Sequence, residues 1–221
     1  MLQHGENHAR GIWTGWSTIS ANNDLSFTIW LTGLPGSGKT TLAKLLKKAI
    51  AARGYKVEII DTQMLSRWLN LELQISEEII EDHSHTLGYD AFITHICTIL
   101  SHNGIICITA SVSPYSAART YAREQIQQFI EVYLHCSDEQ RQKRLKQLDA
   151  ASTITADLYQ PPLTPELSID TSLDFPELGA LRIISFLERH SYLAPLCEDA
   201  DAKDEQIDII KARLQALGYL E

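Results

Sequence analysis

One glycine-rich segment has the residue types and spacing that bind phosphate groups. Residues 33–40 read Gly-Leu-Pro-Gly-Ser-Gly-Lys-Thr and match the pattern G-x-x-x-x-G-K-[ST]. Glycines allow the backbone to form a ring of N–H donors around a phosphate, and the N-terminus of the following helix adds partial positive charge. In this pattern Lys39 reaches the β- and γ-phosphates and the Thr40 hydroxyl ligates Mg²⁺. The segment predicts a nucleoside triphosphate site formed by Gly33, Pro35, Gly36, Ser37, Gly38, Lys39, Thr40 and Thr41.

A carboxylate, Asp61, follows the second apolar run of the chain. In a kinase, a carboxylate at this place faces Mg²⁺ or the acceptor hydroxyl, where it orients the attacking oxygen and withdraws its proton. The guanine-reading pattern N-K-x-D of GTPases is absent from the sequence, and 221 residues are few for a AAA-type machine. The sequence therefore predicts a small ATP-dependent kinase with Lys39 and Asp61 as catalytic residues. A turn or cap role for Asp61 stays open as an alternative.

Short apolar runs alternate with longer amphipathic segments, and these elements position the candidate residues. Strands are predicted over residues 28–32, 57–60, 105–109, 129–134 and 167–169. Helices are predicted over 42–50, from Ser76 to His102, after Ser113 as cap with Pro114 at the first helical position, after Ser137, and over 174–190. This alternation is typical of right-handed βαβ crossovers. The predicted fold class is α/β: a P-loop NTPase three-layer sandwich, with a mainly parallel five-stranded sheet and helices on both faces.

Composition and charge limit the classes of partner. Apolar residues make up 44 % of the chain, and 19 Lys and Arg stand against 28 Asp and Glu, which gives a net charge of −9. This balance argues against binding to nucleic acid or to an anionic membrane, both of which depend on clustered positive charge. No apolar stretch is long enough for a membrane span, and the cysteines occur singly, as in a reducing compartment. We therefore expect a cytoplasmic protein whose partner is a small-molecule nucleotide.

The chain is expected to divide into three parts. In residues 1–26 the apolar residues recur at neither helical nor strand spacing, and this segment is interpreted as an N-terminal strap. Residues 27–192 are interpreted as the P-loop kinase domain, and residues 193–221 as an acidic C-terminal helical tail.

Several motifs beyond the phosphate loop are similar to those of the adenylylsulfate (APS) kinase family. They are residues 28–41, Arg53 to Val57 leading to Asp61, Leu69-Asn70, Ser76-Glu-Glu78, Ile108 to Ala110, Ser113-Pro-Tyr115, Ala122-Arg123, residues 129–133, and Pro165 to Leu167 with Asp170-Thr171. The resemblance covers roughly residues 26–190 in order. It implies the reaction ATP + APS → ADP + PAPS, in which the 3′-hydroxyl of the adenosine is phosphorylated with Mg²⁺ present. It also implies a homodimer and acceptor contacts from Asp61, Asn70, Ser113, Pro114 and Tyr115, to which Arg67 is added as a candidate contact beside the motif.

The sequence departs from the family pattern on the acceptor side. Where the family has D-G-D-N-I-R, Gln63 replaces the second Asp and Ser66 replaces the Arg, with Arg67 next to it. Ser111 stands where the family has Phe, other family positions hold Ile75, Ile80, His83 and Ser116, and the lid between Leu145 and Tyr159 is shortened. An Arg contact to an anion contributes roughly 1.5–3 kcal/mol, so these losses weaken APS binding unless other cations replace the contacts. The candidate replacements are Arg67, His83 and His85.

Three interpretations stay open after these departures. The chain is an APS kinase, a kinase that phosphorylates the 3′-hydroxyl of a different nucleotidyl substrate, or a non-catalytic nucleotide-binding regulatory module. Arg119 and Arg123 lie four residues apart after the Ser113 turn, and they either contact the acceptor or are solvated.

Overall fold

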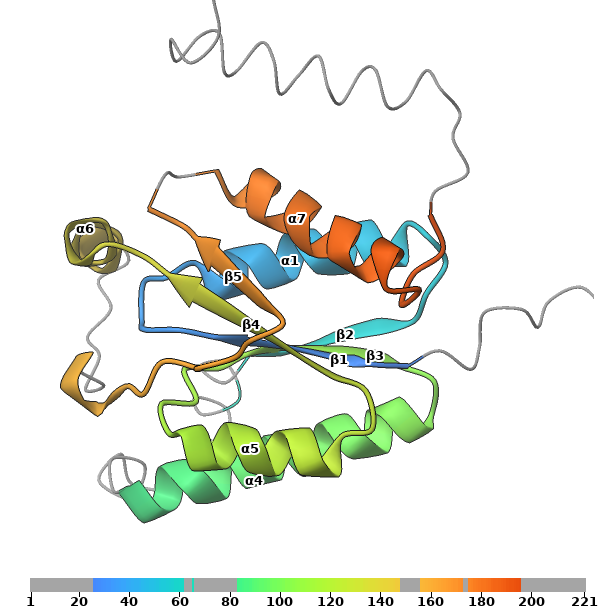
Figure 1. Ribbon diagram of the computed structural model, residues 1–221, viewed down its shortest axis with the longest axis horizontal. Helices are drawn as coiled ribbons and strands as arrows, with labels where there is room; N and C mark the ends of the chain where they lie inside the picture. The colour runs from blue at the N-terminus through green and yellow to red at the C-terminus, as the bar shows by residue number, and fades with distance from the viewer. Residues whose placement is uncertain (1–25, 62–64, 66–82, 148–155, 173–174, 196–221) are drawn as a thin grey trace, which may run out of the picture. The chain divides into compact units, whose positions relative to one another are not determined.

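The computed structural model of the chain describes residues 26–61, 65, 83–147, 156–172 and 175–195. Within them the strands are β1 (Thr28–Thr32), β2 (Val57–Asp61), β3 (Ile106–Ala110), β4 (Phe129–His135) and β5 (Leu167–Asp170). They form one sheet in the order β2-β3-β1-β4-β5, and every neighbouring pair is parallel (Figure 1). Strand β1 therefore lies at the centre of the sheet, and its carboxyl end leads into the phosphate loop.

The central strands are buried on both faces, as their sequences predict. Every residue of β1 and of β3 is buried, and both strands consist of apolar residues and threonine. Helix α1 (Lys39–Ala51) and the first half of α7 (Pro176–Arg189) cover one face of the sheet, and α4 (His83–His102) and α5 (Ser116–Gln125) cover the other (Figure 1). This arrangement confirms the predicted α/β sandwich.

The boundaries of the elements lie close to the predicted ones. The strands predicted at 57–60, 105–109, 129–134 and 167–169 all end one residue later than predicted. Helix α6 (Asp138–Gln147) begins as expected, because Gln140 N–H donates to Ser137 Oγ at 3.4 Å, and the 3-10 helix η1 (Ala156–Leu158) follows it. The helix predicted from Ser76 to His102 is described from His83 onward.

The predicted start of helix α5 is wrong. We expected Ser113 as cap and Pro114 as the first helical residue, but α5 begins at Ser116 after an extended Tyr115 that makes no side-chain cap bond. The physical reason is that the Ser113 hydroxyl is bonded elsewhere in the core. The cap is supplied from a distant segment instead, since Gln160 Oε1 accepts from Ser116 N–H and from Ser116 Oγ, each at 2.9 Å.

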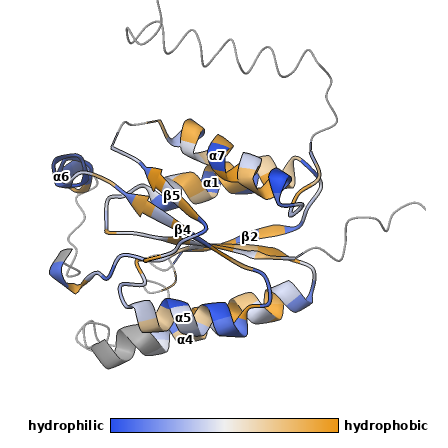
Figure 2. Ribbon diagram, viewed as in Figure 1, coloured by the Kyte–Doolittle hydropathy of each residue, from blue (hydrophilic) through white to orange (hydrophobic). Residues whose placement is uncertain are grey.

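An apolar cluster fills the space between the sheet and helices α4 and α5. Its buried members are Trp30, Ile93, Cys97, Cys107, Ala122, Ile126 and Phe129. Figure 2 shows the strands mainly apolar and α6 strongly hydrophilic. Cys97 and Cys107 are fully buried and form no disulfide, so these thiols act as small core residues.

The chain divides into two compact units, Met1–Ile183 and Ile184–Glu221, and the division falls inside α7. In the second unit the N–H groups of Tyr192 and Leu193 donate to the Leu187 carbonyl oxygen at 2.8 and 3.2 Å, after α7 has ended. The boundaries proposed at residues 26 and 192 stay predictions, because the strap and nearly all of the tail lie outside the described residues. None of the helices in the described ranges combines the length and the apolarity that crossing a bilayer requires.

Candidate active site

The phosphate loop connects the central strand β1 to helix α1. Gly33 adopts φ +149°, and a Cβ there would lie 2.3 Å from the Leu134 carbonyl oxygen. Gly36 adopts φ +81°, and a Cβ there would lie 2.9 Å from the Arg141 carbonyl oxygen. Only glycine fits at these two positions, because a side chain would collide with the backbone of neighbouring segments. The predicted phosphate-binding residues thus lie together in this tight loop and in the first turn of α1.

The Lys39 side chain lies inside the loop. It is 8 % exposed, and its ammonium group donates to the carbonyl oxygens of Gly33 at 2.7 Å and Leu34 at 3.0 Å. Burial lowers the pKa of Lys39 to about 7; the Asp61 carboxylate opposes this shift and the Arg141 guanidinium adds to it. The loop therefore holds the ammonium group at the position where a triphosphate would supply stronger anionic partners.

Asp61 lies beside Thr40. It ends β2 level with Ala110 of the neighbouring strand β3, and its side chain is 7 % exposed. The Thr40 hydroxyl donates to Asp61 Oδ2 at 2.8 Å. The structure therefore brings the Thr40 hydroxyl, at the end of the phosphate loop, into contact with the Asp61 carboxylate, at the end of β2.

The oxygens of Thr40 and Asp61 fit a magnesium ion. Mg²⁺ prefers oxygen ligands and is usually bound by one or two protein groups together with substrate phosphates and waters. In the part of the chain that the structure describes, no group of three or more His, Cys, Asp and Glu side chains could hold a metal without a substrate. The Thr40 hydroxyl and the Asp61 carboxylate are oxygen donors of the kind that Mg²⁺ prefers.

A pocket of about 420 Å³ opens beside the phosphate loop. One side is lined by loop residues: Pro35, Gly36, Gly38, Lys39, Thr40 and Thr41. The other side includes Arg144, Leu145, Thr171 and Phe175, which combine a cation with apolar surface. A pocket of this size, lined by the phosphate loop, by a cation and by apolar side chains, suits a nucleotide whose phosphates lie on the loop.

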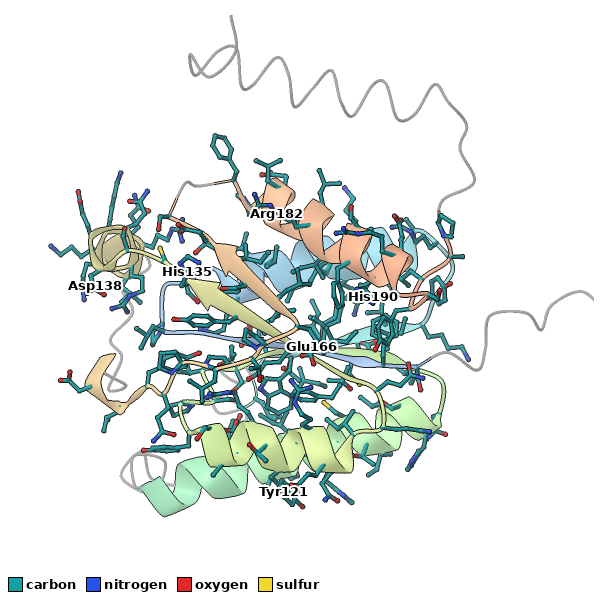
Figure 3. All side chains as sticks on the ribbon, viewed as in Figure 1. Tyr121, His135, Asp138, Glu166, Arg182 and His190 are labelled. Carbon is teal, nitrogen blue, oxygen red and sulfur yellow. The ribbon has the colours of Figure 1, made fainter. Side chains whose placement is uncertain are left out.

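Two arginines of α6, which sequence reasoning missed, border the loop. Arg141 Nη1 donates to the Pro35 carbonyl oxygen at 3.1 Å. Arg144 donates to the carbonyl oxygens of Gly36 at 3.3 Å and Thr171 at 2.6 Å. Figure 3 places this hydrophilic helix, labelled at Asp138, just beyond the end of β4. The signal that could have revealed them is a spacing of three residues between cations in the segment after a parallel strand.

The predicted acceptor contacts are placed only in part. Arg67, Asn70 and the side chains of His83 and His85 lie outside the described residues. Ser113 is 1 % exposed, and Pro114 is also buried, whereas Tyr115 is half-buried. The Ser113 hydroxyl donates to Asp90 Oδ1 at 2.9 Å and accepts from Trp30 Nε1 at 3.2 Å. The segment lies at the carboxyl edge of the sheet, but this hydroxyl points into the protein.

Arg119 and Arg123 both form ion pairs. Arg119 is 3 % exposed and donates to Glu131 Oε1 at 2.8 Å, to the Ser113 carbonyl oxygen at 2.6 Å and to the Gln160 carbonyl oxygen at 2.6 Å. Arg123 donates through two nitrogens to the carboxylate of Glu166, labelled in Figure 3, at 2.6 and 2.8 Å. Of the two side chains, Arg119 is therefore not solvated, and it ties the Ser113 segment to β4 and to the segment after η1.

Comparison with known proteins identifies relatives over most of the chain. The family model described as adenylylsulphate kinase matches residues 25–170. A probable adenylyl-sulfate kinase of Pyrococcus abyssi is 37 % identical over 176 residues, which are 76 % of this chain and 98 % of that protein. A second probable adenylyl-sulfate kinase, from Archaeoglobus fulgidus, is 38 % identical over 156 residues, which are 66 % of this chain and 97 % of that protein.

Solved structures have the same fold. The crystal structure of APE1195 matches with a TM-score of 0.62 and 30 % identity, over 75 % of this chain and 96 % of that one. The Mycobacterium tuberculosis APS kinase CysC, solved with AMPPNP and APS, matches with a TM-score of 0.64 over 74 % of this chain and 98 % of that one. At 23 % identity the latter likeness is evidence for the fold alone.

Proposed function

This chain is a kinase of the adenylylsulphate kinase family, and on that premise we propose that it transfers the γ-phosphoryl group of ATP to the 3′-hydroxyl of adenylyl sulfate. The bond between the γ-phosphorus and its bridging oxygen breaks, a bond to the 3′-oxygen forms, and the hydroxyl proton passes to a base. The products are ADP and 3′-phosphoadenylyl sulfate. The observation that carries the proposal is the 2.8 Å contact between Thr40 and Asp61, which sets a carboxylate against the phosphate loop.

The donor side of the reaction is assigned to the loop and its neighbours. Backbone N–H groups of the loop and the α1 N-terminus would bind the phosphates, and Lys39 would exchange its carbonyl partners for phosphate oxygens. Arg144 is close enough to the loop to add charge on the side of α6. Mg²⁺ would be held by Thr40 and by the nucleotide, with Asp61 beside it, and would supply positive charge to the transferred phosphoryl group.

Asp61 is assigned to the acceptor hydroxyl as well as to the loop. Its carboxylate would orient the 3′-hydroxyl toward the γ-phosphorus and accept its proton during transfer. General base catalysis by one carboxylate typically contributes about 10²- to 10⁴-fold in rate. The burial of Asp61 supports this role, because a carboxylate that is shielded from water keeps a fixed orientation.

The test is an assay of ADP release by the purified chain with ATP, Mg²⁺ and adenylyl sulfate, with the product identified by ion-exchange chromatography. We expect Asp61→Asn to lower kcat by about 10²- to 10⁴-fold with little change in KM for ATP. Glu58→Gln is the matched control, since it removes an exposed carboxylate from the same strand and should leave kcat unchanged. Absence of ADP release that depends on adenylyl sulfate would remove this acceptor.

A second candidate function is the phosphorylation of a different nucleotidyl substrate. The observation that favours it is Ser111, which stands where the family resemblance implies Phe and which donates to Asp90 Oδ1 at 3.2 Å. Because this hydroxyl is buried against Asp90, the position lacks the aromatic ring of the family pattern, which favours an acceptor of different shape. The same assay with a panel of 3′-hydroxyl nucleotides separates the two. Binding of MgATP without turnover of any acceptor would instead favour the non-catalytic regulatory module.

Formation of a homodimer and location in the cytoplasm stay predictions.

A further inference from the structure

The segment that follows β3 contains a strained residue. Ser113 has φ +41°, a left-handed conformation that non-glycine residues rarely adopt. Contacts from three other elements hold it there. Asp90 of α4 accepts from its hydroxyl, Trp30 of β1 donates to that hydroxyl, and Arg119 of α5 donates to its carbonyl oxygen at 2.6 Å. A strained residue held by several contacts is typical of functional sites, where the surrounding structure fixes a conformation.

Asp90 is the least expected of these partners. Its side chain is 2 % exposed, and Oδ1 accepts from both Ser111 Oγ at 3.2 Å and Ser113 Oγ at 2.9 Å. Over the described residues, its second oxygen, Oδ2, is buried without a hydrogen-bond partner. Burial raises the pKa of Asp90 to about 6, and the hydroxyls of Ser113 and Ser111 and the charge of Arg119 offset only part of this rise. A serine or an apolar residue would be less costly in this core, so the carboxyl group is not explained by stability.

The residues that Asp90 holds lie directly beside the reaction site. Ser111 follows Ala110, the residue of β3 that pairs in register with Asp61. Val112, between the two serines, lines the same pocket as the phosphate loop, and its carbonyl oxygen accepts from Thr32 Oγ1 at 2.7 Å. A shift of this segment would therefore move groups at the sheet edge where the acceptor must approach Asp61.

We propose that Asp90 is a positioning residue for the acceptor: by holding Ser111 and Ser113 it fixes the segment 111–115, and so the surface that the acceptor contacts. The inference rests on the proposed function, since it takes segment 111–115 as part of the acceptor site. It assigns no contact between Asp90 and the substrate. It differs from a purely structural role in one respect: loss of the carboxyl group changes the handling of the acceptor much more than the handling of ATP.

The experiment compares Asp90→Ala, Asp90→Asn and Ser113→Ala with wild type in the assay with adenylyl sulfate. We expect Asp90→Ala to raise KM for adenylyl sulfate about ten-fold with KM for ATP within about two-fold, and Asp90→Asn, which keeps Oδ1, to recover most of that loss. Ser113→Ala should act in the same direction, and the double variant with Asp90→Ala should be no worse than the stronger single variant. Thr98→Val is the control, because it removes one hydrogen bond from α4 two turns away, between Thr98 Oγ1 and the Thr94 carbonyl oxygen.

Hydrogen exchange of the segment 111–116 completes the test without any acceptor. We expect faster exchange there in Asp90→Ala and not in Thr98→Val. Equal effects on both substrates, additive effects in the double variant, or unchanged exchange would overturn the proposal. If wild type does not use adenylyl sulfate, the proposed function fails by itself, and the exchange result alone decides whether Asp90 fixes the segment. Where Asp90→Ala does not fold, Asp90→Asn and Ser113→Ala provide the same comparison.

Discussion

Ionisation of the buried carboxyl group of Asp90 should make the folded protein less stable. Burial raises the pKa of Asp90 from 3.8 to about 6, and the hydroxyls of Ser113 and Ser111 and the charge of Arg119 offset only part of this rise. One pKa unit corresponds to about 1.4 kcal/mol, so ionised Asp90 is unfavourable by about 3 kcal/mol. The native state holds this proton more tightly than the unfolded chain does. The contribution of this group to the free energy of unfolding is therefore greatest below pH 4 and falls as the pH rises from about 4 to about 6. Above pH 6 the folded protein is less stable by the full amount of about 3 kcal/mol.

Asp90→Asn isolates this effect, because an amide does not ionise. We expect the free energy of unfolding of the variant, relative to wild type, to increase by about 2 kcal/mol between pH 4 and pH 8. Urea unfolding at each pH measures the difference, and any fixed effect of the amide cancels. Glu58→Gln, which replaces an exposed carboxylate, is the control, and its difference from wild type should change far less. A difference for Asp90→Asn that is constant with pH would refute the reasoning, since the carboxyl group would then ionise as in the unfolded chain.

Two further variants test the loop and the buried ion pair. Gly36→Ala places a Cβ at φ +81° and 2.9 Å from the Arg141 carbonyl oxygen, so calorimetry should show MgATP binding weakened by about ten-fold; binding equal to that of wild type would mean that the loop can shift. Glu131→Leu removes the acceptor of Arg119 Nε from a pair whose side chains are only 4 % and 9 % exposed. An unpaired buried guanidinium should lower the free energy of unfolding by about 3–5 kcal/mol in urea, and a loss below about 1 kcal/mol would contradict that assignment.

The donor side of the site could be predicted from the sequence because its determinants are contiguous. Gly33, Gly36, Lys39 and Thr40 all stand within one eight-residue motif, although the backbone that crowds the two glycines, at Leu134 and Arg141, is distant in the sequence. The strands could be predicted for a similar reason. Parallel strands covered on both faces need nearly uniform apolar runs, and β1 and β3 have them. Asp61 could be placed because it directly follows such a run.

The acceptor side could not be predicted in the same way, because long-range contacts build it. Ser113 reads as a helix cap followed by proline, yet its hydroxyl is bonded to Trp30, 83 positions earlier, and to Asp90, 23 positions earlier. The cap of α5 comes instead from Gln160, 44 positions after Ser116. No local pattern contains these pairings, and local propensity gives way where buried polar groups must find partners.

Because the donor side is built from one motif and the acceptor side from distant segments, substitutions have different effects on the two sides. A change in the phosphate loop alters the contiguous motif assigned to the ATP phosphates, so it affects ATP directly. A change at Arg119 acts through three segments at once, because its guanidinium joins β4, the segment after β3 and the segment after η1. Variation at such a position, far from any contiguous motif, can reshape the acceptor surface while the loop stays intact. The family resemblance implies this form for the chain, with a loop that matches the pattern and departures on the acceptor side.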